Sequence, residues 1–252
     1  MFINEKQPLT TMKAKPEVLA IIPARGGSKG IPRKNIKLIA GKPMIAYSIE
    51  EAKKSKYITK IMVNTEDKEI AEVAKTYGAE IFERPMEFAE DLSTDFDVFF
   101  HQLKTMKAHG YNPDIVVQLR PNLPCRTAQH IDECIEKFIQ NPDADSVRSI
   151  KETPKHPMKM WKIEGDFLKP FISAEQSGIK DSSDLPRQSL PKVFIHTASV
   201  DIINPKTILE KKSMTGNVVR FVEIKELTAN IDDMTDFAVA EQILLARKNS
   251  KK

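Results

Sequence analysis

A cluster of glycine and basic residues follows an apolar run near the start of this sequence. The run occupies residues 18–22, and the loop after it carries three glycines, Gly26, Gly27 and Gly30, and several basic side chains, among them Arg25, Lys29 and Lys34. Glycine lets backbone N–H groups approach an anion, and arginine and lysine supply the positive charge that a polyphosphate requires. The loop therefore predicts a binding site for a nucleoside triphosphate.

The spacing of these residues matches neither of the common phosphate-binding loops. A P-loop ends in Gly-Lys-Ser or Gly-Lys-Thr, whereas Gly30 is followed by Ile31 and Pro32. The dinucleotide pattern also fails, because the glycines within residues 26–30 have the wrong spacing. A polar turn without a ligand is the alternative interpretation of so short a motif.

The elements around the loop predict an α/β fold. An apolar run bounded by proline and glycine indicates a buried parallel strand, and open α/β sheets bind ligands at the carboxyl ends of such strands. Strand patterns recur at 60–65, 79–82 and 114–119, and helical patterns begin at Pro43, Asp67, Asp95 and Thr127. This alternation predicts a Rossmann-like, doubly wound and mostly parallel sheet.

The alternation stops after Ile150. Residues 151–191 are rich in Pro, Lys, Ser and Asp, and they predict an excursion from the sheet that returns at 193–203. Apolar side chains such as Trp161 and Phe167 within it need a partner surface to cover them. We expect a flexible N-terminal extension over residues 1–17, one domain over residues 18–252, and a final helix near 235–248.

Composition excludes several classes of protein. The 252 residues carry 39 Lys and Arg against 35 Asp and Glu, so the net charge is only +4. Basic and acidic residues also alternate along the sequence, which argues against a nucleic-acid surface. No apolar run reaches membrane-spanning length, so we expect no membrane partner. Two cysteines, Cys125 and Cys134, suggest neither a disulfide framework nor a zinc cluster, and we expect a cytoplasmic protein.

Five blocks in order resemble the acylneuraminate cytidylyltransferase family, the CMP-sialic acid synthetases and their relatives. The blocks are residues 20–35, 61–67, 82–94, 118–127 and 229–236. The resemblance implies a cytidylyltransferase that joins CTP to an acidic keto-sugar, a homodimer, and catalytic roles for Arg25, Lys29 and Asp232. It also implies a set of nucleotide-binding residues: Arg25, Gly27, Ser28, Lys29, Lys34, Asn35, Arg84 and Arg120.

The acidic block departs from the family pattern at one position. Asp232 matches the second aspartate of an Asp-Ile-Asp motif, whereas Asn230 stands where the first is expected. Nucleotide-bound Mg²⁺ takes one or two carboxylates beside phosphate oxygens and waters, so the resemblance implies a Mg²⁺ site at Asp232 and Asn230. The alternative is that Asp232 and Asp233 only cap the last helix.

The sugar site departs from the pattern more strongly. The resemblance implies that Arg187 and Gln188, in a Pro-Arg-Gln segment, bind the acidic sugar, and an arginine fork suits a carboxylate. A second arginine expected near residues 195–198 is absent. In the fourth block Asn122 and Leu123 replace two hydroxyl residues, and only Asn122 keeps hydrogen-bonding capacity for a ligand.

These departures leave alternatives to the cytidylyltransferase prediction. One is the same fold acting on a different sugar or nucleotide, and the other is a nucleotide-binding protein that has lost turnover. We favour the enzyme because the basic residues of the phosphate loop are all present.

Overall fold

A computed structural model describes residues 15–226 and 229–250 of the chain. The predicted N-terminal extension therefore lies outside the described residues as far as residue 14. The chain divides into two compact units. The main unit ends at Ser149 and resumes at Thr197, and the inserted unit spans Ile150–His196.

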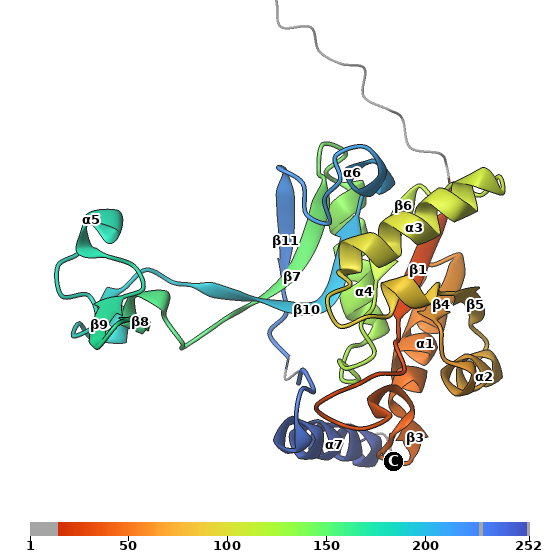
Figure 1. Cartoon of the computed structure of the whole chain (residues 1–252), viewed down its shortest axis with the longest axis horizontal. Helices are drawn as coiled ribbons and strands as arrows, with labels where there is room; N and C mark the ends of the chain where they lie inside the picture. The colour runs from red at the N-terminus through yellow and green to blue at the C-terminus, as the bar shows by residue number, and fades with distance from the viewer. Residues whose placement is uncertain (1–14, 227–228, 251–252) are drawn as a thin grey trace, which may run out of the picture. The chain divides into compact units, whose positions relative to one another are not determined.

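A seven-stranded sheet forms the centre of the main unit (Figure 1). Its order is β11-β7-β10-β6-β1-β4-β5, and β1 pairs in parallel with both β4 and β6, while β10 runs antiparallel to β6. This confirms the predicted mostly parallel sheet. The strands are β1 Val18–Pro23, β4 Lys60–Thr65, β5 Glu80–Glu83, β6 Ile115–Gln118, β7 Ser146–Glu152, β10 Phe194–Ile203 and β11 Val219–Glu223.

Strand β1 is buried on both faces because its side chains alternate between two apolar layers. Val18, Ala20 and Ile22 join the cluster that includes Ile49, from a helix on one side of the sheet. Leu19 and Ile21 join the cluster of the opposite layer, where helix α3, Asp95–Ala108, supplies Phe99 and Leu103. A strand held between two layers places its carboxyl end, and the loop that follows, at a fixed position.

Four helices of the main unit begin within one residue of the predicted starts at Pro43, Asp67, Asp95 and Thr127. Asp67 accepts a hydrogen bond from the Ile70 backbone N–H, and Thr94 and Thr127 each form a capping box. The helices of the main unit are α1 Met44–Lys54, α2 Lys68–Thr76, α3 Asp95–Ala108, α4 Ala128–Ile139, α6 Pro205–Leu209 and α7 Met234–Asn249. Among the described helices, none is both long and apolar enough to cross a bilayer.

Two strands of the sheet were not predicted. Strand β7 alternates buried and partly exposed side chains through Arg148 and Lys151, and β11 lies at the sheet edge with Phe221 exposed. Between β1 and α1 the chain also forms a short 3-10 turn, Lys34–Ile36, and strand β2 Leu38–Ile39 paired with β3 Lys42–Pro43, none of which was predicted. These elements are short or polar, so their periodicity is weak.

The inserted unit contains one antiparallel hairpin, β8 Trp161–Glu164 and β9 Phe167–Pro170, followed by α5 Ala174–Ser177. Gly165 adopts φ +64° in the hairpin turn, a conformation that favours glycine. The hairpin exposes large apolar side chains on its surface, namely Trp161, Ile163, Phe167 and Leu168. Lys159 Nζ donates hydrogen bonds of 2.7 Å to the carbonyls of Ser183 and Leu185 and so holds the loop that contains these two residues.

Candidate nucleotide-binding site

A cavity of about 410 Å³ opens at the carboxyl end of β1 in the main unit. It brings together most of the residues predicted to bind nucleotide and metal, and one predicted to bind the sugar, Asn122. The nucleotide and metal residues in its lining are Arg25, Ser28, Lys29, Lys34, Asn35, Arg84, Arg120 and Asp232. Gly27 and Asn230 are not among its lining residues. Segment 88–95 forms a further wall, which the sequence prediction did not include.

Close contacts fix the path of the phosphate loop. The Gly26 N–H donates to Glu66 Oε1 at 2.7 Å, and Asn35 Nδ2 donates to the Arg25 carbonyl at 2.9 Å. A Cβ atom on Gly26 would lie 2.6 Å from Asp67 Oδ2, and one on Gly30 would lie 2.4 Å from the Asp232 carbonyl oxygen. Glycine is therefore required at position 30, where the obstacle is backbone, whereas a side chain at position 26 would force the Asp67 carboxylate to shift.

The cations of the loop face carboxylates on two sides. Lys29 Nζ lies 2.6 Å from Asp91 Oδ2, and Arg25 Nη1 lies 3.3 Å from Asp91 Oδ1. These contacts, with that of Lys29 the larger, lower the pKa of the Asp91 carboxyl. Lys34 Nζ donates to the Ile231 carbonyl at 2.8 Å and lies 3.9 Å from Asp232 Oδ1. Three positive side chains thus converge on one cavity, as a polyphosphate site requires.

Arg84 lies in the cavity wall between the ends of β4 and β5. Its Nε donates to Asn64 Oδ1 at 2.6 Å and its Nη2 donates to the Asn64 carbonyl at 2.9 Å. Burial lowers the pKa of this guanidinium, and the nearby Glu66 carboxylate opposes that effect. Arg84 is 6% exposed yet lines the cavity, and its two hydrogen bonds to Asn64 fix the position of its guanidinium.

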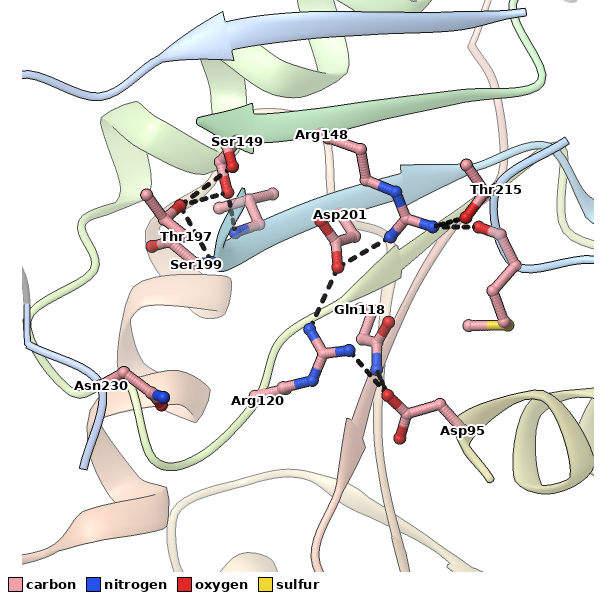
Figure 2. A network of polar contacts seen from close by, with 12 residues as sticks. Asp95, Gln118, Arg120, Arg148, Ser149, Thr197, Ser199, Asp201, Thr215 and Asn230 are labelled. Atoms are coloured by element: carbon pink, nitrogen blue, oxygen red, sulfur yellow. Dashed lines mark hydrogen bonds and ion pairs between the residues drawn. The ribbon is translucent and has the colours of Figure 1, made fainter. Parts of the chain in front are cut away.

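Arg120 lies at the end of β6 in a network of polar groups that are buried or partly buried (Figure 2). Its Nη2 lies 2.7 Å from Asp95 Oδ2, at the first residue of α3, and its Nη1 lies 3.1 Å from Asp201 Oδ2 on β10. Gln118 Nε2 also donates to Asp95, at 2.8 Å. Arg148 Nη1 approaches Asp201 from β7 at 2.9 Å.

The carboxylates of the acidic block near the last helix lie in two different environments. Asp233 Oδ1 accepts hydrogen bonds from the N–H groups of Thr235 and Asp236, and Asp236 completes the capping box, so these two carboxylates cap α7. The Asp232 side chain takes no part in the capping box and lines the cavity, while its backbone N–H donates to Asp236 Oδ2 at 3.0 Å. Asn230 Nδ2 donates to Asp232 Oδ2 at 2.7 Å.

The donor set suits one particular kind of metal site. Among the described residues, no group of three or more His, Cys, Asp or Glu side chains could hold a metal ion. A nucleotide-bound cation needs only one or two protein carboxylates, because phosphate oxygens complete its shell. Asp232, with 68% of its side chain exposed, fits that lesser requirement. Asn230 presents its nitrogen to Asp232, so its oxygen would reach a shared cation only after the amide rotates.

Arg126, near Arg120 in the sequence, is structural. It is 3% exposed, and its guanidinium donates to the Ser199 carbonyl, the Ser48 hydroxyl and the Arg120 carbonyl. Burial lowers the pKa of Arg126 to about 9. The side chain therefore links α1, β10 and the loop after β6 instead of facing a ligand.

Arg187 and Gln188 lie in the inserted unit, where they line a separate cavity of about 510 Å³. Lys192 and Glu152 form an ion pair of 3.1 Å among the residues of that cavity. His156 is buried there, accepting from the Met158 N–H and lying 2.9 Å from the Pro191 carbonyl. The cavity offers Arg187 as a cation for a carboxylate.

The residues that sequence reasoning missed are acidic or lie within strands. Asp91 lies within the third block of the resemblance, residues 82–94, and Asp95 follows that block directly, but neither was assigned a role, and their contacts now mark them. Asp201 did leave a signal, because it is the one charged residue in the buried end of β10, the run Val200–Ile203. A fully buried carboxylate requires a partner, and that requirement alone points to nearby arginines.

Comparison with known proteins now adds to this geometry. A family model described as Cytidylyltransferase matches residues 19–164. The chain belongs to the cytidylyltransferase family. This cytidylyltransferase is 30% identical to Post-translational flagellin modification protein B of Campylobacter coli, over 92% of this chain and 97% of the relative. It is also 30% identical to CMP-N,N'-diacetyllegionaminic acid synthase of Legionella pneumophila, over 90% of this chain and 96% of that protein.

Other relatives differ in length or are more distant. The N-acylneuraminate cytidylyltransferase of Escherichia coli is 28% identical, and the match covers 94% of this chain but 54% of the relative. A solved CMP:2-keto-3-deoxy-manno-octonic acid synthetase complexed with CTP superposes with a TM-score of 0.67 at 15% identity, covering 92% of this chain and 99% of that one. This likeness confirms the fold of the cytidylyltransferase.

Proposed function

We propose that this cytidylyltransferase transfers the cytidylyl group of CTP to a hydroxyl of an acidic keto-sugar and releases pyrophosphate. The observation that carries the proposal is the single cavity in which Arg25, Lys29 and Lys34 converge opposite Asp232. The relatives whose names include a CMP-sugar synthase or an acylneuraminate cytidylyltransferase support the same substrate class.

In the proposed reaction the sugar hydroxyl oxygen attacks the α-phosphorus in line with the bond to the bridging oxygen. That bond breaks, and pyrophosphate leaves with the negative charge that develops. Such chemistry depends on positioning and on charge stabilisation more than on covalent intermediates. Arg25 and Lys29 would stabilise the leaving group, and Ser28, Lys34, Asn35, Arg84 and Arg120 would position the nucleotide from the lining of the cavity. Gly27 is proposed to lie beside the nucleotide as part of the same loop, although it does not line the cavity.

The proposed cofactor is Mg²⁺, held by the Asp232 carboxylate together with phosphate oxygens. Bound there, Mg²⁺ would neutralise phosphate charge. Asn230 is proposed to assist, either as a hydrogen-bond donor to Asp232 or, after rotation of its amide, as a second oxygen ligand. Asp232 would also orient the attacking hydroxyl.

The inserted unit is proposed to serve the sugar and the assembly. Arg187 would bind the sugar carboxylate through its guanidinium fork, with Gln188 beside it, and Asn122 would contact the sugar from the main unit. The exposed apolar hairpin of the inserted unit supports a homodimer, because a second copy would cover Trp161, Ile163 and Phe167.

One experiment tests the function as a whole. Purified protein with Mg²⁺ is mixed with each of four nucleoside triphosphates and a panel of acidic sugars, and pyrophosphate release is measured. We expect release with CTP and with at least one acidic keto-sugar. Release with another nucleotide would favour the alternative specificity, and CTP binding without release for any sugar would favour a nucleotide-binding protein.

A further inference from the structure

Three side chains beside the nucleotide cavity form a chain of hydrogen bonds that ends at the proposed metal ligand. Asn122 Nδ2 donates to Asn230 Oδ1 at 2.7 Å, and Asn230 Nδ2 donates to Asp232 Oδ2, also at 2.7 Å. Asn122 belongs to the loop after β6 and lies 108 positions from Asn230 in the sequence. The two asparagines stand at positions where the sequence departs from the family pattern, and the fold brings them into direct contact.

The two hydrogen bonds fix the orientation of the Asn230 amide. An asparagine side chain has one acceptor oxygen and one NH2 donor group, so its orientation follows from its partners. Here the oxygen meets a donor, and the nitrogen meets a carboxylate. The opposite orientation would set the NH2 group against that of Asn122 and the oxygen against the Asp232 carboxylate, and both hydrogen bonds would be lost. Asn122 therefore keeps the nitrogen of Asn230 on Asp232.

Backbone contacts hold the same segment on both sides. The Ile231 N–H donates to the Asn122 carbonyl at 2.9 Å, and the Ile231 carbonyl accepts from Lys34 Nζ at 2.8 Å. The Asp232 N–H donates to Asp236 Oδ2 at 3.0 Å, in the first turn of α7. The hydrogen-bond chain thus rests on a backbone that is fixed to the loop after β6, to the phosphate loop and to a helix.

The Asp232 carboxylate has a different neighbour at each oxygen. Its Oδ2 accepts from Asn230, whereas its Oδ1 lies 3.9 Å from Lys34 Nζ. The carboxylates of Asp233 and Asp236 are engaged in the cap of α7. A divalent cation without nucleotide would therefore meet one carboxylate beside an ammonium, and no amide oxygen. Phosphate oxygens change this balance, because they ligate the cation and attract the Lys34 ammonium.

Resting on the proposed function, we infer that Asn122 is a positioning residue that holds Asn230 as a donor to Asp232, so that of these three side chains only Asp232 ligates the cation. Of the two roles proposed above for Asn230, this selects the hydrogen-bond donor. The site then takes a divalent cation as a complex with nucleotide phosphates and not as a free ion. The pair of asparagines replaces the two-carboxylate arrangement that the resemblance implies with a site of one carboxylate.

The first test measures binding of Mn²⁺, a paramagnetic substitute for Mg²⁺, in the absence of sugar, so that a lost sugar contact of Asn122 does not enter the result. Electron paramagnetic resonance follows free Mn²⁺, and calorimetry follows the Mn²⁺–CTP complex and CTP with a chelator. We expect the wild-type protein to bind the complex and to show no saturable binding of free Mn²⁺ over the same concentrations.

Asp232→Asn tests whether this carboxylate is the ligand. We expect the variant to bind the Mn²⁺–CTP complex about tenfold or more weakly, the scale for losing a charged interaction. It should not weaken the binding of metal-free CTP, because the substitution removes a negative charge beside the phosphates. Weaker binding of CTP in both forms would show a role other than metal ligation and would overturn the inference.

The second test reverses the hydrogen bond between the two asparagines. Asn122→Asp keeps the shape of the side chain but has only acceptor oxygens, so it pairs with Asn230 only when the amide turns its nitrogen toward position 122. The Asn230 oxygen then faces Asp232, an arrangement that a cation between the two oxygens stabilises. We expect this variant to bind free Mn²⁺ about tenfold or more tightly than the wild type. Damage to the fold does not produce such a gain.

Two controls separate rotation of the amide from the added negative charge. With Asn230→Ala there is no amide to rotate, so adding Asn122→Asp to it should gain less than about fivefold, the scale of an exposed ion pair. Asn204→Asp places the same charge at the cap of α6, outside the cavity lining, and should leave Mn²⁺ binding unchanged. Asn122→Ala removes only the donor to Asn230 and should give a smaller gain, which serves if Asn122→Asp does not fold.

The inference is overturned if the wild-type protein binds free Mn²⁺ as tightly as Asn122→Asp does, or if neither variant of Asn122 gains binding. It is also overturned if the gain is as large in the presence of Asn230→Ala, since the added charge alone then explains it. Failure of the proposed function gives a different result, because the wild-type protein then binds CTP neither with nor without Mn²⁺.

Discussion

Asp91 forms ion pairs with two cations of the phosphate loop, with its Oδ2 2.6 Å from Lys29 Nζ and its Oδ1 3.3 Å from Arg25 Nη1. A carboxylate in this position is a stand-in for the phosphate groups that the loop is proposed to bind. Any nucleotide must displace it before the loop can contact the leaving group. The adjoining Leu92 is 92% exposed, so the segment meets little obstruction as it moves.

Asp91→Asn should therefore tighten pyrophosphate and CTP binding. We expect an improvement of about two- to fivefold at low salt, the scale of an exposed ion pair, and less at high salt. Titration calorimetry at two ionic strengths measures it, with Glu87→Gln in the same segment as the control. Weaker binding in Asp91→Asn would mean that this carboxylate serves the ligand directly.

Arg25→Ala should lower turnover by at least ~10²-fold, the scale for removing one preorganised donor to a developing charge. The side chain contributes only exposed contacts to the fold, so the thermal transition should remain close to that of the wild type. Steady-state pyrophosphate release measures the effect. A folded variant with near-normal turnover would remove Arg25 from the catalytic residues.

Asp232 and Asp233 provide a matched pair for the metal site. Asp232→Asn should raise the Mg²⁺ concentration needed for half-maximal activity, whereas Asp233→Ala should leave it unchanged and cost about 0.5–2 kcal/mol of stability as a lost helix cap. Asn230→Asp should tighten Mg²⁺, and Mg²⁺ should then raise its melting temperature, because two carboxylates would repel without a cation. Equal Mg²⁺ dependence in all three variants would place the metal elsewhere.

A mixture of two inactive variants tests the proposed dimer. If the inserted unit of one subunit completes the sugar site of the other, Arg25→Ala and Arg187→Ala subunits should restore part of the activity when combined, because a mixed dimer then has one intact site. Light scattering measures the assembly. A strictly monomeric protein contradicts the dimer, and dimers without rescue place Arg187 in the site of its own subunit.

The Asp145 carboxylate should contribute to the free energy of unfolding at neutral pH, and this contribution should be lost in acid. Burial acts to raise its pKa, but Lys211 Nζ at 2.5 Å and the N–H groups of Asn217 and Val218 lower the pKa to about 2. Because the folded pKa lies below the ordinary value, the stabilisation is complete above pH ~4 and is lost as the pH falls toward ~2.

The measurement compares denaturant unfolding of the wild type and Asp145→Asn from pH 6 to pH 2. The difference in unfolding free energy should shrink by about 2 kcal/mol over that range. Asp143→Asn, at an exposed ion pair with Arg220, is the control and should show no such trend. A constant difference for Asp145→Asn would contradict the predicted shift.

Local patterns in the sequence were sufficient to predict much of this fold. The buried run of β1, the Thr127 cap and the helix Asp95–Ala108 all lie where apolar periodicity and a capping residue indicated. Strands β7 and β11 were missed because a polar or edge strand has little apolar periodicity, and its position depends on its neighbours in the sheet.

The site was predictable in part for the same reason. Lys29 and Lys34 stand in a motif whose composition alone suggests phosphate binding. The partners of Arg120 were not predictable, because Asp95 and Asp201 are distant in sequence and meet only when α3 and β10 pack beside β6. Whether a basic residue has spare charge depends on such tertiary contacts.

The contact between the phosphate loop and the acidic block has a consequence for synthesis of the protein. Lys34 Nζ donates to the Ile231 carbonyl across 197 positions of sequence, and Gly30 lies against the carbonyl of Asp232. A nascent chain therefore carries the strand and its basic loop long before it carries their counterpart. Until translation has passed Asp232, the growing chain lacks these contacts, so the wall of the cavity at Asp232 is completed only after the acidic block has been made.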